Sequence, residues 1–139
     1  MIPETLVLAQ KMYEIAEAIE ASLSDEKWRT AVKIKNSVSD AYFNIAQIEG
    51  AGPNESQDFD CANARKALSA LKAMYIFAHK EQMTELDPTL VVAIDTLIEK
   101  IDVVNADSKK AAKIKDKKDL EPWLEKYRIW QKISEKSKP

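Results

Sequence analysis

Apolar side chains recur at alternating steps of four and three residues over four segments, and this spacing limits the possible folds more than any other feature. It places the apolar side chains on one side of an α-helix. Helices are therefore predicted over residues 3–23, 25–48, 58–82 and 88–106. The predicted apolar positions are Leu8, Met12, Ile15, Ile19, Leu23, Trp28, Ala31, Ile34, Val38, Ala41, Ile45, Ile48, Ala64, Ala67, Leu68, Leu71, Met74, Tyr75, Phe77, Ala78, Leu90, Ile94, Leu97, Ile101 and Val104.

The connections between these helices are short, with one exception. Both glycines lie within residues 50–57, beside Pro53, and this composition predicts a loop. Asp87 followed by Pro88 indicates a helix start, because aspartate caps free amide groups and proline fits the first turn. The pattern predicts an all-α fold, an up-down-up-down four-helix bundle over residues 1–106. The loop breaks exclude a two-helix coiled coil.

Residues 107–139 differ in composition and are expected to form a C-terminal helical extension. Residues 109–118, here called the lysine segment, contain six lysines and almost no apolar side chain. This segment is either a solvated continuation of the fourth helix or a linker. A new helix is expected to start at residues 119–122, because Trp123, Tyr127 and Trp130 follow at helical spacing.

Charge divides the chain at the same place. Residues 1–104 carry ten Lys and Arg against seventeen Asp and Glu, a net charge of −7. Residues 105–139 carry eleven against six, a net charge of +5. The predicted bundle is therefore acidic and its extension basic, although the second and third helices also hold basic residues.

The sequence lacks the residues that several classes of function require. No apolar run reaches the ~18–20 residues of a membrane span, and the first residues lack the pattern of a signal peptide, so we expect a cytoplasmic protein with no membrane contact. One histidine, His79, and one cysteine, Cys61, exclude an internal disulfide and a structural zinc site of the usual kind. A di-metal carboxylate site needs Glu three residues before His, where this chain has Ile76. We therefore expect no enzyme and no cofactor.

The extension predicts an arm that binds RNA or DNA. Lysines neutralise phosphates whatever the base sequence, and exposed aromatic rings stack on unpaired bases. The alternative is that the lysines form only a solvated helix face, while the aromatic residues pack on the bundle or on a neighbouring subunit. The candidate nucleic-acid-binding residues are Lys109, Lys110, Lys113, Lys115, Lys117, Lys118, Trp123, Tyr127, Arg128 and Trp130 of the extension, with Lys33 and Arg65 of the bundle.

The bundle helices carry more apolar residues than one bundle can bury. Tyr42, Phe43, Ile76, Val91 and Ile98 lie beside the main apolar positions. Left on a monomer they would form apolar surface patches, so a homo-oligomer is expected.

Residues 8–106 resemble a known family. The resemblance lies in residues 12–19, in residues 38–52 with the Gly50-Ala-Gly52 turn, in residues 58–71, and in the helix after Met83-Thr84. These patterns are similar to the small four-helix-bundle proteins encoded in intervening sequences of large ribosomal RNA genes. They are closest to the accessory variability determinants of diversity-generating retroelements.

The resemblance implies a non-enzymatic protein that assembles as a five-fold ring and works with a reverse transcriptase and its template RNA. The chain departs from the family in its charge, since the retroelement proteins are strongly basic and this bundle is acidic. The expected function is an oligomeric accessory protein that binds a reverse transcriptase and nucleic acid. The alternative is a structural or protein-interaction bundle that does not contact nucleic acid.

Overall fold

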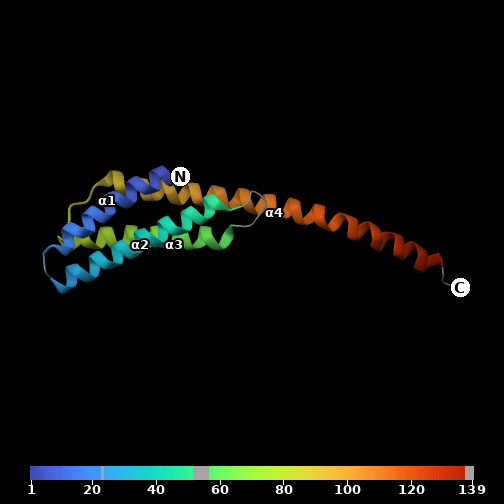
Figure 1. Cartoon of the computed structure of the whole chain (residues 1–139), viewed down its shortest axis with the longest axis horizontal. Helices are drawn as coiled ribbons and strands as arrows, with labels where there is room; N and C mark the ends of the chain where they lie inside the picture. The colour runs from blue at the N-terminus through green and yellow to red at the C-terminus, as the bar shows by residue number, and fades with distance from the viewer. Residues whose placement is uncertain (23, 52–56, 137–139) are drawn as a thin grey trace.

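The computed structural model describes residues 1–22, 24–51 and 57–136, and these residues form helices and no strand (Figure 1). The predicted all-α class is therefore confirmed. Leu23 and most of the predicted glycine-containing loop lie outside the described residues. The helices are α1 (Ile2–Glu20), α2 (Asp25–Gly50), α3 (Asp58–Lys80) and α4 (Pro88–Lys136).

Helix α2 lies at the centre of a helical bundle. It packs against α1 and α3, and α3 packs in turn against the first half of α4 (Figure 1). Successive helices run in opposite directions, so the N-terminus lies beside α4. An ion pair between Glu4 and Lys100 joins α1 to α4.

The core is formed by one side of each helix, as the spacing predicts. Most of the predicted apolar positions are buried, because each helix turns them toward its neighbours. The buried apolar residues are Leu8, Met12, Ala16, Ile19, Ala31, Ile34, Val38, Ala41, Ile45, Ile48, Cys61, Ala64, Ala67, Leu68, Leu71, Tyr75, Ala78, Leu90, Ile94, Leu97 and Ile101.

Two predicted core residues are corrected by the structure. Trp28 is 52% exposed and Phe77 is 39% exposed. Thr30 is buried in place of Trp28, and because residues two apart on a helix point about 200° apart, the indole turns away from the core. Phe77 lies at the edge of an open groove between α2 and α3, beside Arg29.

Tyr75 and Asp87 fix the connection between α3 and α4. The Tyr75 hydroxyl donates to the Glu85 carbonyl at 3.2 Å and accepts from the Asp87 N–H at 2.7 Å. The Asp87 carboxylate accepts from the Thr89 N–H at 2.9 Å, which confirms the predicted cap. Hydrogen bonds from Thr89 hold the pKa of Asp87 below its ordinary value.

Helix α3 ends in a Schellman motif, in which one residue takes the left-handed conformation. Gln82 is that residue, with φ of 61°. Its N–H donates to the His79 carbonyl at 3.0 Å, and the Met83 N–H donates to the Ala78 carbonyl at 2.8 Å. Glycine is the usual residue at this position because it has no Cβ.

Replacing Gln82 by glycine is expected to raise the free energy of unfolding by about 0.5–1 kcal/mol. The left-handed conformation costs a residue with a side chain about 1–2 kcal/mol, and the greater freedom of glycine in the unfolded chain offsets part of that gain. Urea denaturation followed by circular dichroism measures the change. Gln82→Ala is the control, because it keeps a Cβ and should not stabilise. Equal free energies for wild type and Gln82→Gly would contradict the explanation.

Replacing Ile94 by aspartate should cost several kcal/mol and unfold a domain of ordinary stability, because Ile94 is 0% exposed and the carboxylate would be buried without a partner. Leu71→Asp should behave in the same way. Val92→Asp is the matched control, since Val92 lies on the same helix and is 62% exposed. Thermal melting by circular dichroism should separate the variants, and an unchanged Ile94→Asp melting temperature would remove Ile94 from the core.

Candidate nucleic-acid interface

The second half of α4 projects beyond the other helices (Figure 1). The last buried residue on α4 is Ser108, which is 8% exposed. We call residues 109–136 the arm, and at about 1.5 Å per residue it is about 42 Å long. The arm brings ten of the twelve candidate residues onto one helix.

Helix α4 continues through residues 107–122, so the expected new start at residues 119–122 is wrong. Lysine and alanine are good helix formers, and they fill most of residues 109–118. Pro122 stands inside the helix, where it removes one backbone hydrogen bond. Residues 113–133 are exposed, so water can bind the carbonyl group that Pro122 leaves free. The lysine segment is thus a helix and not a linker.

The lysine segment carries its charge around the helix. Lys110, Lys113 and Lys117 recur at i, i+3 and i+7 and therefore lie on one side. Lys115 and Lys118 lie near Ile114 on another side. Among the described residues, Lys109 is the only lysine of this segment in an ion pair, 3.0 Å from Asp58. The segment has six lysines and one aspartate, a net charge of +5.

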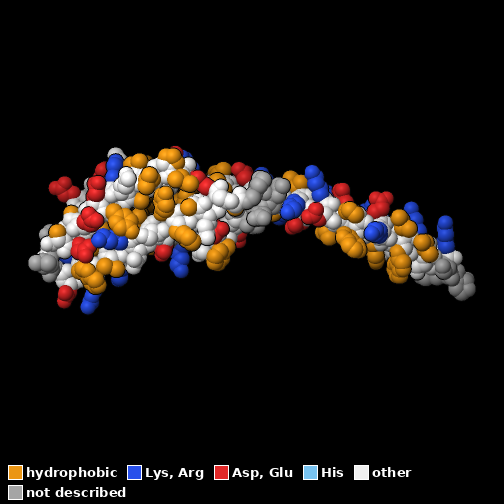
Figure 2. Space-filling model, viewed as in Figure 1, with side chains coloured by type: hydrophobic (Ala, Val, Ile, Leu, Met, Phe, Trp, Pro, Cys, Tyr) orange, Lys and Arg blue, Asp and Glu red, His pale blue; other side chains and the backbone are white. Residues whose placement is uncertain are grey.

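The aromatic stripe, defined as Leu120, Trp123, Leu124, Tyr127 and Trp130, follows the lysine segment along α4. Its residues recur at steps of three and four, so they share one side of the helix. Each of them is about half exposed or more, from 49% for Leu124 to 68% for Trp123. Figure 2 shows hydrophobic side chains following one edge of the projecting helix.

The aromatic side chains also contact one another and a lysine. The rings of Tyr127 and Trp130 are stacked, with centroids 6.1 Å apart. The Lys126 ammonium group lies 5.1 Å from the centre of the Trp123 ring, a cation–π contact. Arg128 is exposed on the same helix. Despite these contacts, each of the three rings is more than half exposed.

Charge is not spread evenly along the arm. Residues 119–136 hold four acidic and four basic side chains, so the part that carries the aromatic stripe is neutral. The whole positive charge of the arm therefore resides in the lysine segment. Electrostatic attraction for anions is therefore greatest at that segment.

A polar cluster holds the base of the arm against the start of α3. Asp58 accepts a hydrogen bond from the Asn105 side chain at 3.1 Å as well as the ion pair from Lys109. Both hold the pKa of Asp58 below its ordinary value. The Ser108 hydroxyl accepts from the Gln57 N–H at 3.4 Å. Sequence reasoning missed this cluster, since its members are about 50 residues apart and share no periodicity.

The two candidate residues of the bundle, Lys33 and Arg65, lie apart from each other and do not form one cluster with the candidate residues of the arm. The Arg65 guanidinium is 3.2 Å from Asp102, so it lies near the end of the bundle from which the arm projects. Lys33 lines the groove that also contains Met74 and Phe77. These two residues are nine and twelve positions beyond Arg65 on α3, or about 13–18 Å along the helix. Lys33 therefore lies toward the opposite end of the bundle.

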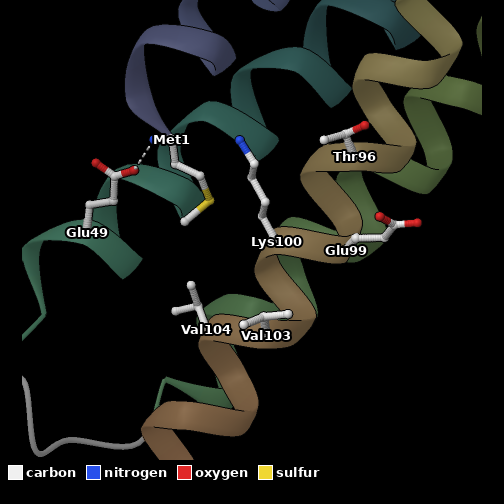
Figure 3. A pocket seen from close by; sticks show the side chains of 7 residues that line it. All are labelled: Met1, Glu49, Thr96, Glu99, Lys100, Val103 and Val104. Atoms are coloured by element: carbon white, nitrogen blue, oxygen red, sulfur yellow. Dashed lines mark ion pairs between the residues drawn. The ribbon is translucent and has the colours of Figure 1, made fainter.

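An open groove of about 510 Å³ lies where the start of α1, the end of α2 and α4 meet (Figure 3). Its floor is mostly apolar, and the Met1 ammonium group forms an ion pair with Glu49 at 3.5 Å at its edge. The lining residues are Met1, Glu49, Thr96, Glu99, Lys100, Val103 and Val104.

The histidine and the cysteine make structural contacts. His79 Nδ1 donates to the Thr84 carbonyl at 3.2 Å, at the end of α3. Cys61 is 2% exposed, and burial raises the pKa of its thiol. The nearby carboxylates of Asp60 and Asp58 raise that pKa further, because they disfavour a second negative charge.

Cys61 is expected to react with a thiol reagent at least about a hundredfold more slowly in the folded chain than in urea, because the thiolate is the reactive form and the thiol is buried. Absorbance with 5,5′-dithiobis(2-nitrobenzoic acid) at neutral pH measures both rates. Similar rates in the folded and unfolded chain would contradict the buried position.

No protein-family model, curated protein or solved structure matches the chain. Within the described ranges, no three His, Cys, Asp or Glu side chains gather closely enough to hold a metal ion. None of the helices described is both long and apolar enough to cross a membrane.

Proposed function

We propose that this protein is a non-enzymatic, oligomeric accessory protein that binds RNA or DNA through the lysine segment of its arm. The observation that carries the proposal is a net charge of +5 on ten exposed or half-exposed helical residues, held outside an acidic bundle. Its setting is an up-down-up-down bundle with a C-terminal extension in the cytoplasm. The resemblance to retroelement accessory proteins suggests a reverse transcriptase as the protein partner and a five-fold ring as the assembly.

The projection of the arm matters because the bundle would repel nucleic acid. The lysine segment extends about 14 Å from the last buried turn of α4, and charges are screened over about 8 Å at physiological salt. A phosphate beside Lys117 therefore meets the lysines and little of the bundle's negative charge. The retroelement accessory proteins that the chain resembles are strongly basic, and in this chain the arm would supply the positive charge that the acidic bundle lacks.

The alternative function is protein interaction without nucleic acid. The exposed aromatic stripe supports it, because large exposed apolar patches on helices usually mark protein interfaces. Salt distinguishes the two functions. Phosphate contacts release counterions and weaken steeply as salt rises, whereas apolar contacts do not.

Replacing Lys110, Lys113 and Lys117 by glutamine should weaken binding of a labelled single-stranded RNA and reduce the slope of log K against log salt by about 2, since about 0.7 counterions are released per phosphate on a single strand. Fluorescence anisotropy over a series of KCl concentrations measures both quantities. Because glutamine is also a good helix former, the arm should remain helical.

The matched control replaces Lys11, Lys66 and Lys80 by glutamine. These lysines are exposed on the bundle, so the control changes the net charge equally and leaves the arm intact. Equal losses of RNA affinity in the two triple variants would show that binding depends only on the net charge of the chain, and would contradict a binding site on the lysine segment. Absence of any salt-dependent RNA binding by the wild-type chain would reject the proposal and leave the protein-interaction function.

The reverse transcriptase is tested separately. A reverse transcriptase encoded beside this gene, and retained by the immobilised full chain at moderate salt, would support the retroelement assignment. A gene neighbourhood with no reverse transcriptase would reject that assignment without affecting the RNA result.

A further inference from the structure

The aromatic stripe cannot be covered by the bundle of its own chain. Helix α4 is continuous from Pro88 to Lys136, so no hinge within it brings the stripe back to the bundle (Figure 1). Three exposed aromatic rings and two leucines stay on the surface of a single helix. A stable occupant must come from another molecule.

We propose that the arm pairs with the arm of a second copy of this chain, in antiparallel orientation, about a twofold axis near residue 125. Leu120, Trp123, Tyr127 and Trp130 follow steps of three, four and three, which is the spacing of a short coiled coil. This spacing is symmetric about residue 125. A second helix that runs in the opposite direction therefore presents its stripe residues at the same spacing, facing the stripe of the first helix.

The symmetric register matches large side chains with large side chains. Leu120 would face Trp130 of the second copy, and Trp123 would face Tyr127 of the second copy. Leu124 would lie beside its own equivalent near the axis. The next positions outward in the same repeat are Asp116 and Ser134, which are polar and end the apolar contact at both ends.

The exposed area is sufficient for a modest dimer. An aromatic side chain offers about 150–250 Å² and each here is more than half exposed, so the three rings present roughly 350 Å². The two leucines bring the stripe to roughly 500 Å². Pairing two stripes would bury about 1,000 Å², which is the size at which specific interfaces begin.

Charge favours the antiparallel orientation. Residues 119–136 are neutral, so the two paired segments do not repel each other. A parallel pair would place two lysine segments of +5, and two bundles of −7, side by side. The antiparallel pair places the lysine segments at opposite ends, where they remain free. The pairing therefore does not rest on the proposed RNA binding and is compatible with it.

The arm is also long enough for the pairing. With the axis at residue 125, Lys136 of the second copy would lie opposite Ile114. That position is six residues beyond Ser108, where α4 leaves the bundle. The two arms overlap along the aromatic stripe, and each bundle lies beyond the end of the other arm.

Sedimentation equilibrium of the full chain, up to about 100 μM, tests the pairing. Wild type should self-associate, and Trp130→Asp should weaken the association at least about tenfold, because an anchor ring is replaced by a charge. Ile129→Asp is the matched control: Ile129 is 53% exposed, next to Trp130, and lies on the other side of the helix. It should associate like wild type.

Cross-linking tests the orientation in a Cys61→Ala chain. A short bis-maleimide should link Leu124→Cys to its equivalent near the axis. Lys117→Cys should not be linked, because in the antiparallel pair its equivalent lies about 24 Å away along the axis, whereas a parallel pair would bring the two together. Ile129→Cys controls for random collision.

Four results would overturn the proposal. A wild-type chain that stays monomeric at the highest concentration would do so, as would equal association of Trp130→Asp and Ile129→Asp. Cross-linking of Lys117→Cys to its equivalent would reject the antiparallel orientation, because only a parallel pair brings these two residues together. If Trp130→Asp weakens RNA binding and leaves the mass unchanged, the stripe contacts bases and not a second copy.

Discussion

The unequal length of the helices is the constraint on which the rest of the structure depends. Helices α1, α2 and α3 have 19, 26 and 23 residues, whereas α4 has 49. A helix buries its apolar side only where neighbours flank it, so burial on α4 stops at Ser108. Beyond that residue the same helix, with the same regular backbone, buries none of its described side chains.

Local periodicity was enough to predict the helices of the bundle and the side that each one buries. Ile34, Leu71 and Ile94 are buried because their spacing is a property of the helix itself. Trp28 could not be placed in this way, since spacing alone does not show which edge of the apolar side of α2 the neighbouring helices cover. The contact of Asp58 with Asn105 and Lys109 was equally inaccessible, because it joins positions that only the tertiary structure brings together.

The composition of the candidate site was predictable from the sequence, but the relative directions of its side chains around the helix were not. The lysines and the aromatic residues were recognised from the sequence, while a linker between them remained an open alternative. A linker would leave the angular relation between Lys117 and Leu120 undefined. The continuous helix fixes it, so Lys113, Lys117, Leu120, Leu124 and Tyr127 follow one another along one side. The helical spacing after Pro122 does not show where the helix begins, and the good helix formers before Pro122 extend it without a break.

The two parts of the arm would respond to salt in opposite ways, because different forces govern them. Attraction between lysines and phosphates weakens as salt rises, because the release of counterions is less favourable when the solution already contains more ions. Contacts between apolar rings are not screened, and salts that are excluded from protein surfaces strengthen them. One helix therefore holds a salt-sensitive surface next to a salt-resistant one. The separation follows from the sequence, in which all net positive charge of the arm precedes residue 119 and all of its aromatic residues follow it.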